Sequence, residues 1–421
     1  MKRHMRILRI ALAAAAIVAL TGPSGAAASG KRAVVEVRTV KVGAPGNPSV
    51  GVVPFTDAAY QSCADAPQSQ PACQQVGGVN YRYGIGQLEI TVRQWVKFLN
   101  TADPTGRDRH NLYDPTESSS GWPKYGQINA SSRARRGRHY SVGYPQWADK
   151  PYGFANFLRA ARFVNSLYNG RVLSKKAGAA AGFRYVSYRV RLSRQTERGM
   201  YDLARHKRSG ATRAHKSGFV VPSQDEWIKA AYYDPSGGGT YSYWKYPTNP
   251  GVFGDGTATA PSSTTLDPST GDVTNAATQP LANYHASGLP APSWCPAAVQ
   301  PGNCSSVNPF GFDPTIYAEL YQGSLGTVGQ AGTLSPWGTL DQGGNAVEWT
   351  DTITPPPSGR KEGRVWRRLH GGIANAPAYQ LWLSAVGLQP QSNPFYDLTY
   401  PWLGFRVGVR GNLSPARGAA R

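Results

Sequence analysis

Histidines and acids are the side chains of this sequence best suited to acid–base chemistry or to metal binding near neutral pH. Glu226, Glu348 and Asp351 could each act as a general acid or base, yet each also fits an ordinary structural role. Beyond residue 28, no two histidines have the close spacing that places two imidazoles on one helix face. These histidines are His110, His139, His206, His215, His285 and His370. Their spacing does not by itself indicate catalysis, and a site assembled from distant loops stays open.

The four cysteines fall into two close pairs, Cys63 with Cys73 and Cys295 with Cys304. In a chain bound for an oxidising compartment, this pattern predicts two local disulfides. Each would close a short loop and add about 2–3 kcal/mol to stability by constraining the unfolded chain. A four-cysteine metal site is the alternative, but the ligands of such sites are usually separated by about two to four residues.

The first residues have the three parts of a secretory signal. A basic start is followed by an apolar run from Ile10 to Leu20 and then by small residues that end at Ala28. The run is shorter than the roughly 20 residues that span a hydrocarbon core. We therefore expect cleavage after Ala28 and a secreted protein, or one exported to the periplasm or cell envelope, with no transmembrane segment.

Basic residues are concentrated in one region of the chain. Residues 131–216 hold twenty Lys or Arg against three acids, a local charge of +17, whereas the whole chain carries +21. Such a segment predicts an anionic partner, for example an acidic glycan, a lipid headgroup or a nucleic acid. The alternative is a solvated insert that only aids solubility.

The elements that must position these residues are short and separated by long loops. Glycine and proline number 48 and 33, beside 11 Trp and 23 Tyr, which is typical of a globular domain rich in loops. Three helices are predicted from apolar faces next to capping or stop signals. The first begins after Thr91, the second runs from Phe154 to Tyr168, and the third begins at the capping box of Ser223 and Glu226. Strands are predicted at 33–40, 88–90, 343–352, 365–372 and 404–410, and regular signals are sparse from 235 to 338.

Six blocks of the sequence occur in an order typical of one family. They are EITVRQWVKFLN, VPSQDEWIKAAYYD, ANY at 282–284, LDQGGNAVEWTDT, LHGG and GFRV. In this order they resemble the sulfatase-modifying-factor family, which includes the formylglycine-generating enzymes. The resemblance implies one α+β domain with little regular secondary structure, related to C-type lectin folds. Together, the signal, the charge pattern and the resemblance give the expected domains: a signal peptide at 1–28, an N-terminal extension at 29–80, the family domain at 81–410 with a basic insert around 131–216, and a tail at 411–421.

The resemblance also implies calcium. The family's calcium loop, here LDQGGNAVEW, would use side-chain oxygens of Asp341 and Glu348. It would also use the backbone carbonyls of Gly344 and Ala346, and Asn283 falls where the family has a second calcium site. Calcium takes six to eight hard oxygen ligands and accepts carbonyls beside carboxylates. The alternative is a glycine turn with a buried glutamate that is satisfied by backbone amides.

The family's usual chemistry is not expected in this chain. Formylglycine-generating enzymes oxidise a substrate cysteine with copper held by two cysteines shortly after an RGGS motif. Here that stretch reads LHGGIANAPAYQLWLSAVGLQP and contains no cysteine, so copper is not expected, because thiolates are the ligands that select Cu(I). Some relatives are iron-dependent oxidases with histidine clusters, and iron stays open. His285 and His370 are the candidates for catalysis because both lie beside family motifs, although each also fits a structural role.

Three functions follow as hypotheses. The first is a divergent oxidase-type activity on an unknown substrate. The second is a non-catalytic, calcium-stabilised module that binds a carbohydrate or a peptide through aromatic loops, or an anionic envelope partner. The third is an assembly partner in the cell envelope that docks through the basic segment. Redox-metal content would favour the enzyme, and salt-sensitive association with an anionic polymer would favour the third hypothesis.

Overall fold

In the computed structural model, the described residues fall into several ranges along the chain. These are 33–52, 74–118, 127–180, 182–205, 210–237, 242–252, 259–267, 270–275, 280–284, 325–354, 365–374, 378–383 and 400–414. The expected signal peptide lies outside them, as do the end of the tail and the cysteines Cys63, Cys73, Cys295 and Cys304. The predicted disulfides therefore stay predictions.

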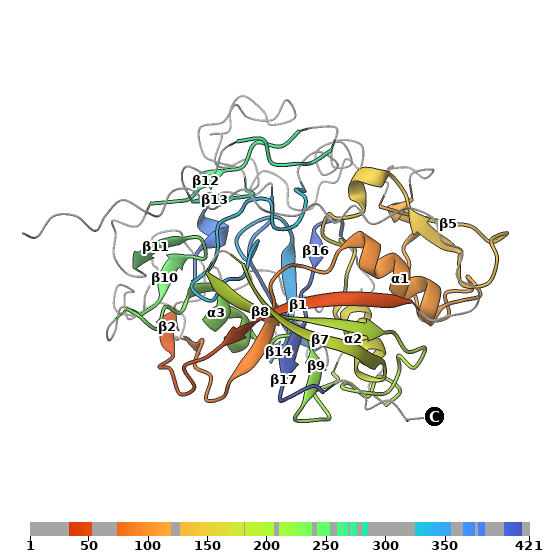
Figure 1. Cartoon of the computed structure of the whole chain (residues 1–421), viewed down its shortest axis with the longest axis horizontal. Coiled ribbons are helices and arrows are strands. Elements are labelled where there is room, and N and C mark those ends of the chain that lie inside the picture. The colour runs from red at the N-terminus through yellow and green to blue at the C-terminus, as the bar shows by residue number, and fades with distance from the viewer. Residues whose placement is uncertain are drawn as a thin grey trace, which may run out of the picture.

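A six-stranded sheet in the order β7-β8-β1-β4-β17-β9 lies at the centre of the fold (Figure 1). All its neighbouring strands are antiparallel. In chain order they are β1 (Val34–Val42), β4 (Tyr83–Gly86), β7 (Arg171–Ala180), β8 (Phe183–Arg191), β9 (Gly218–Val220) and β17 (Gly408–Arg410). The strand expected at 33–40 is confirmed. Because β1 lies between β8 and β4, this part of the expected N-terminal extension is an internal strand of the main sheet.

Valines alternate along β1 because successive side chains of a strand point to opposite faces of the sheet. Val35 and Val37 belong to the main hydrophobic core on one face. Val40 and Val42 belong to a smaller core on the other face, which includes Ala230 of the third helix. The buried face of the strand therefore changes between Val37 and Val40, and Glu36 and Lys41 on the opposite sides are exposed.

The first two helices, α1 (Val92–Ala102) and α2 (Phe157–Tyr168), pack on the main core. Trp95 of α1 lies between rings of other elements and stacks on Tyr152 at 4.2 Å between centroids. It also stacks on Phe163 of α2 at 5.8 Å. The predicted cap is confirmed, because the Thr91 hydroxyl accepts from the amide of Gln94 in a capping box.

The second helix begins three residues later than expected. Phe154 has φ of +55°, a left-handed conformation that a helix cannot include. The side chain of Asn156 accepts from the amide of Arg159 at 2.8 Å and caps the helix at that point. An asparagine cap thus outweighs the apolar pattern that extends back to Phe154.

The third helix, α3 (Gln224–Tyr232), opens at the predicted capping box. The Ser223 hydroxyl accepts from the amide of Glu226 at 3.2 Å, and the carboxylate of Glu226 accepts from the amide of Ser223 at 2.8 Å. Trp227 and the two alanines that follow it on the same face are buried, as expected.

A second, three-stranded sheet has the order β15-β14-β16, with bounds β14 (Val347–Thr354), β15 (Trp366–His370) and β16 (Leu403–Gly404). The strands expected at 343–352 and 365–372 are confirmed by β14 and β15. The stretch expected at 404–410 is divided between two sheets, because β16 ends at Gly404 and β17 begins at Gly408. The strand expected at Leu88–Ile90 is wrong. There the amide of Ile90 donates to Phe405 and its carbonyl accepts from Tyr152, so the backbone joins two different loops instead of one strand ladder.

The remaining regular elements of the described residues are short. The strand pairs are β2 (Val50–Val52) with β3 (Gln74–Val76), β5 (Ile128–Ala130) with β6 (Tyr140–Val142), β10 (Trp244–Tyr246) with β11 (Asn249–Val252), and β12 (Ser262–Ser263) with β13 (Leu281–Ala282). The 3₁₀ turns are η1 (Pro115–Glu117), η2 (Pro145–Trp147) and η5 (Ala378–Leu381). The chain is thus a mixed α+β fold with few helices and mostly strands and loops. Within the described ranges, no helix is long and apolar enough to cross a membrane.

Candidate functional site

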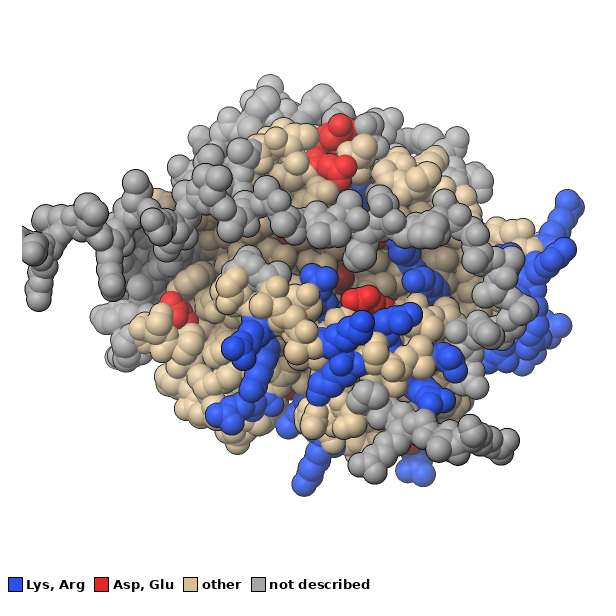
Figure 2. Space-filling view, viewed as in Figure 1, with Lys and Arg blue, Asp and Glu red and all other residues tan. Residues whose placement is uncertain are grey.

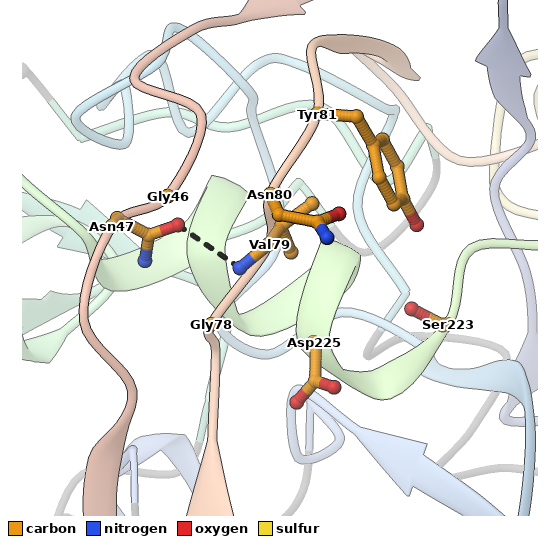
Figure 3. Close-up of a pocket in the computed structure, with 8 residues that line it drawn as sticks. All are labelled: Gly46, Asn47, Gly78, Val79, Asn80, Tyr81, Ser223 and Asp225. Carbon is orange, nitrogen blue, oxygen red and sulfur yellow. Dashed lines mark hydrogen bonds between the residues drawn. The ribbon is translucent and has the colours of Figure 1, made fainter.

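A polar pocket of about 350 Å³ lies where three segments meet beside the start of α3 (Figure 3). Residues 46–47 form one wall, residues 78–81 form the middle, and Ser223 with Asp225 forms the other wall. Figure 3 shows Asn80 and Tyr81 on the segment between β3 and β4, next to the first turn of α3. The pocket therefore depends on contacts between parts of the chain that are far apart in sequence.

Buried hydrogen bonds hold the pocket walls together. Asn47 donates from Nδ2 to the carbonyl of Gly77 and to the hydroxyl of Tyr243, both at 2.8 Å, and its Oδ1 accepts from the amide of Val79 at 3.1 Å. Gly77 has φ of +80°, and a Cβ there would lie 2.6 Å from the Tyr243 hydroxyl oxygen. Only glycine lets the loop approach that tyrosine so closely. The walls are thus fixed before any ligand arrives.

Two polar side chains of the pocket keep hydrogen-bonding capacity for a ligand. Asp225 uses Oδ1 to accept from the amide of Gly77 at 2.8 Å, and within the described chain Oδ2 has no donor. Asn80 is exposed, and its amide can donate and accept. Partial burial, together with the charge of Glu226, raises the pKa of Asp225, while the Gly77 amide lowers it. This arrangement suits ligand groups that both donate and accept hydrogen bonds.

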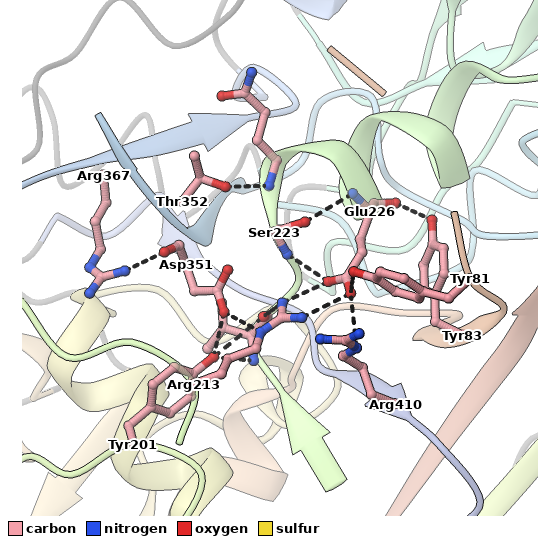
Figure 4. Close-up of polar contacts among 12 residues, drawn as sticks. Tyr81, Tyr83, Tyr201, Arg213, Ser223, Glu226, Asp351, Thr352, Arg367 and Arg410 are labelled. Atoms are coloured by element: carbon pink, nitrogen blue, oxygen red, sulfur yellow. Dashed lines mark hydrogen bonds and ion pairs between the residues drawn. The ribbon is translucent and has the colours of Figure 1, made fainter. Parts of the chain in front are cut away.

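Behind the pocket, a network of charges surrounds Glu226 (Figure 4). Its carboxylate accepts two hydrogen bonds from Arg213, at 2.9 and 2.7 Å, and one from the hydroxyl of Tyr81 at 2.8 Å. Burial would raise the pKa of Glu226, but the charge and hydrogen bonds of Arg213 lower it below its usual value. The predicted role of Glu226 as a cap is confirmed, and the carboxylate is held ionised.

The same arginine also neutralises Asp351 of β14. Arg213 donates from Nε to Asp351 at 2.5 Å, and the Tyr201 hydroxyl donates to the same oxygen at 2.8 Å. Burial raises the pKa of Asp351, and the charge of Arg213 opposes that rise. Arg213 therefore joins two carboxylates that are far apart in sequence, and both have a structural explanation.

The predicted calcium ligand Glu348 is fully buried against Arg406. The guanidinium donates from Nε to both carboxylate oxygens, at 2.9 and 2.6 Å, and Trp227 donates to Oε2 at 2.8 Å. Glu348 is thus a buried glutamate whose carboxylate accepts hydrogen bonds within the fold, as in the alternative to calcium. Its donors, however, are an arginine and an indole rather than backbone amides. A cation at this carboxylate would lie beside the positive charge of Arg406, so Glu348 does not suit calcium.

Asp341 and the carbonyls of its loop suit a cation better. Burial raises the pKa of Asp341 to about 6, and its Oδ2 accepts from the amide of Gly329 at 2.5 Å. Gly344 has φ of +84°, and a Cβ there would lie 2.0 Å from the carbonyl oxygen of Asn283. Among the described residues, no group of three or more acids, histidines or cysteines has the arrangement of a metal site. Calcium at this loop stays a prediction.

The second calcium candidate, Asn283, is tied to the same loop. Its Nδ2 donates to Asn345 Oδ1 at 2.9 Å, and its carbonyl accepts from the amide of Asn345 at 2.8 Å. Asn345 in turn donates to Glu89 at 2.9 Å, and Glu89 also accepts from the amide of Ala346 at 3.0 Å. Burial, with the nearby charges of Asp341 and Glu348, raises the pKa of Glu89 well above its usual value. The loop is thus held by side-chain hydrogen bonds.

The catalytic candidate His370 lies at the end of β15 and is only 3% exposed. Its ring stacks on Trp227 at 5.1 Å between centroids, and its Nε2 has no hydrogen-bond partner among the residues that the structure describes. Burial and the nearby charge of Arg368 lower the pKa of His370 to about 3, so the ring is neutral. His285, the other candidate, lies outside the described residues, and so does His206.

The other histidines of the sequence occupy different places. The ring of His139 is buried and its Nδ1 lies 2.8 Å from the carbonyl of Ser131. His110 lies 3.5 Å from Glu197, and His215 stacks on Tyr168. These three are therefore not gathered with His370 into one cluster.

The basic segment is not a separate insert. Its described residues include α2, β7 and β8, which belong to the main core and the main sheet. Sequence reasoning also missed Arg213, Glu89 and Arg406. Arg406 could have been found, because a charge between the apolar residues Phe405 and Val407 must be paired once that segment is buried.

Comparisons with known proteins leave the family open. No family model matches the chain, and no curated protein matches it. Among solved structures, the chain is similar to the Treponema denticola variable protein 1, at 15% identity, with 90% of this chain and 96% of that chain covered and a TM-score of 0.40. A likeness at this level supports no inference about function.

Proposed function

We propose that this chain is a ligand-binding module of the sulfatase-modifying-factor type, and that its polar pocket takes a neutral, hydroxylated ligand such as a glycan segment. The observation that carries the proposal is the pocket beside α3, whose polar groups come from three segments fixed by buried hydrogen bonds. A site fixed in advance binds without the entropy cost of ordering its loops. The volume of about 350 Å³ lies at the lower end of the range for ligand pockets.

A sugar is the ligand that matches the available groups. Each hydroxyl can donate to the carboxylate of Asp225 and accept from the amide of Asn80. The ring of Tyr81 is engaged by Arg410, whose guanidinium lies 4.0 Å from the ring centroid. Recognition therefore depends on hydrogen bonds with Asp225 and Asn80 and not on stacking of the ligand against an aromatic face.

Two observations favour binding over oxidase chemistry. A substrate would have to reach His370, whose ring is 3% exposed and lies against Trp227. The stretch after LHGG also lacks the cysteines that hold copper in the enzymes this chain resembles. A divergent oxidase would thus need groups other than these, and His285 is the remaining candidate from the sequence.

The calcium-stabilised loop and the relation to C-type lectin folds belong to the same proposal. The support for calcium is the buried carboxylate of Asp341, in the same loop as Gly344 and Ala346, which is joined to Asn283. Calcium would add positive charge beside this buried acid, whose pKa is raised by burial even though the charge of Arg406 lowers it, and would stiffen the loop. Export, by contrast, rests only on the signal-like N-terminus.

The test is binding of neutral oligosaccharides, first on an array and then by calorimetry with any that bind. Asp225→Asn keeps the acceptor for Gly77 but removes the charge, and Asn80→Ala removes the exposed amide. Each should weaken binding by about 1–2 kcal/mol, as expected for one or two lost hydrogen bonds. Asp202→Asn is the matched control, because Asp202 pairs with Arg205 away from the pocket. The proposal fails if the neutral sugars do not bind, or if all three variants bind them equally.

A further inference from the structure

One end of the main sheet carries a row of cations on a face that no described element covers. The register places Arg171 opposite Arg191, and Arg189 opposite Glu36. Cross-strand partners point to the same face, so this face carries Arg171 and Lys176 of β7, Arg189 and Arg191 of β8, and Arg38 of β1. We call these five residues the basic sheet face. Figure 2 shows Lys and Arg side chains gathered over β1, β8 and β7 on the side toward the viewer.

These charges are largely uncompensated. Four of the five are exposed and Arg38 is half-buried, and within the described chain none of them forms an ion pair. The acid on the same face, Glu36, accepts a hydrogen bond from the hydroxyl of Ser187. The face therefore carries five positive charges against one negative charge.

The arrangement costs the free fold some stability. Like charges directly opposite each other on neighbouring strands are destabilising, and Arg171 faces Arg191 in this way. Charges spaced apart on loops would make the protein equally soluble. A dense row of cations on a rigid sheet instead suits a partner that presents a row of anions.

We propose that the basic sheet face binds a linear acidic polysaccharide, through its carboxylate or sulfate groups. Neighbouring strands lie about 4.8 Å apart, and residues two apart on one strand lie about 6.7 Å apart. The cations thus recur at intervals comparable to one sugar unit of an extended chain. Four of the five are arginines, whose planar fork pairs with carboxylate or sulfate through two hydrogen bonds.

Two other anionic partners fit this face less well. Proteins that bind single-stranded nucleic acid interleave cations with open aromatic rings, but the ring of Tyr185 on this face is covered by Arg38 at 4.5 Å. Amphipathic surfaces that bind membranes add inserted apolar side chains to the attraction of cations for anionic lipids. Among the described residues, the large hydrophobic side chain that is exposed is Ile353, on β14 of the other sheet.

The test compares two triple variants of the full mature chain, with heparin as the sulfated probe and polygalacturonate as the carboxylated probe. Arg38→Gln/Arg189→Gln/Arg191→Gln removes three charges from the basic sheet face. Arg133→Gln/Arg135→Gln/Arg136→Gln removes three exposed charges from the turn between β5 and β6. The two triple variants therefore have the same net charge. Thermal unfolding of both variants shows whether each still folds.

The sheet-face variant should lose at least about tenfold in affinity for one or both probes and show a shallower salt dependence, since several surface ion pairs are lost together. The turn variant should stay within about twofold of the parent. Equal losses in the two variants would mean that only net charge matters. Absence of binding to both probes, or duplex DNA that binds more tightly and displaces heparin, would also overturn the proposal. None of these outcomes bears on neutral sugars at the α3 pocket.

Discussion

At the scale of single residues, the buried charges of this protein are held by a few arginines. Arg406 satisfies Glu348, and Arg213 satisfies both Glu226 and Asp351. A buried charge that loses its partner leaves the other charge desolvated and uncompensated. The carboxylates that could act as acids or bases by residue type are thereby committed to the fold.

Loss of Arg213 should be severe for stability. Arg213→Ala leaves two buried carboxylates without their partner, so we expect about 3–5 kcal/mol of destabilisation in urea unfolding at neutral pH. Arg205→Ala removes an arginine whose side chain is 80% exposed from its pair with Asp202, and it should cost less than about 1 kcal/mol. Equal effects of the two substitutions would contradict the proposed role of the network.

His370 should make stability depend on pH. Its pKa is about 3 when folded and near 6.5 when unfolded, so the unfolded chain binds the proton more tightly. Stability is therefore full above pH 6.5 and is lost as the pH falls towards 3, by about 2 kcal/mol at pH 5. His370→Phe keeps a ring against Trp227 but cannot titrate. Its unfolding free energy should change less between pH 7 and pH 5 than that of the parent. An unchanged slope would show that His370 binds its proton equally well in the folded and unfolded chains, so that burial does not lower its pKa.

How much of the site could be predicted depends on sequence separation. The capping box of Ser223 and Glu226 spans three residues and could be read from the sequence. The contact between Arg213 and Asp351 spans 138 residues, and that between Glu89 and Ala346 spans 257. No local pattern encodes such contacts, and for that reason the network and the pocket beside it were not expected.

At the scale of elements, helices and strands were predictable where local signals agree. All three helices are predicted from their caps and apolar faces. The predicted start of α2 at Phe154 is wrong, because Phe154 has a left-handed conformation and Asn156 caps the helix. Leu88–Ile90 has the residue types of a strand, but its backbone is paired with two separate loops. Pairing of this kind is decided by tertiary contacts, which outweigh strand propensity.

The glycine of the Asp341 loop gives a prediction at this scale. Gly344 and Gly182 have nearly equal φ, +84° and +82°, but a Cβ at Gly344 would meet Asn283 whereas one at Gly182 would meet open space. Gly182→Ala should cost about 1–2 kcal/mol from backbone strain alone. Gly344→Ala should cost about 1–3 kcal/mol more, because the clash adds to the strain. Similar costs in chemical denaturation would show that the loop relaxes freely.

At the scale of the whole molecule, the topology was the part least open to prediction. The main sheet joins β1 to β8 and β4, and its last two strands, β17 and β9, come from the C-terminal part and the middle of the chain. The basic segment was expected as an insert, yet it contributes a helix and two strands to the centre of the fold. Charge composition indicates where cations occur in the sequence but not which element carries them.

Calcium should stabilise the whole fold if it binds the Asp341 loop. An ion present at about 100 times its Kd adds about 2.7 kcal/mol to the folded state. The thermal midpoint should therefore rise with calcium relative to a chelator, and Asp341→Asn should remove most of that rise. Magnesium serves as the control ion. A thermal midpoint that does not change with calcium, or one that rises equally in the Asp341→Asn variant, would contradict a calcium site at this loop.

Chemical-shift mapping by NMR, during titration with a neutral oligosaccharide that binds, locates the ligand site on the fold. We expect the backbone amides with large shifts to cluster at 46–47, 78–81 and 223–225, where the pocket lies. Shifts that instead cluster around His370, or around the stacked rings of Tyr400 and Trp402, would contradict this expectation and would place the ligand site elsewhere on the fold.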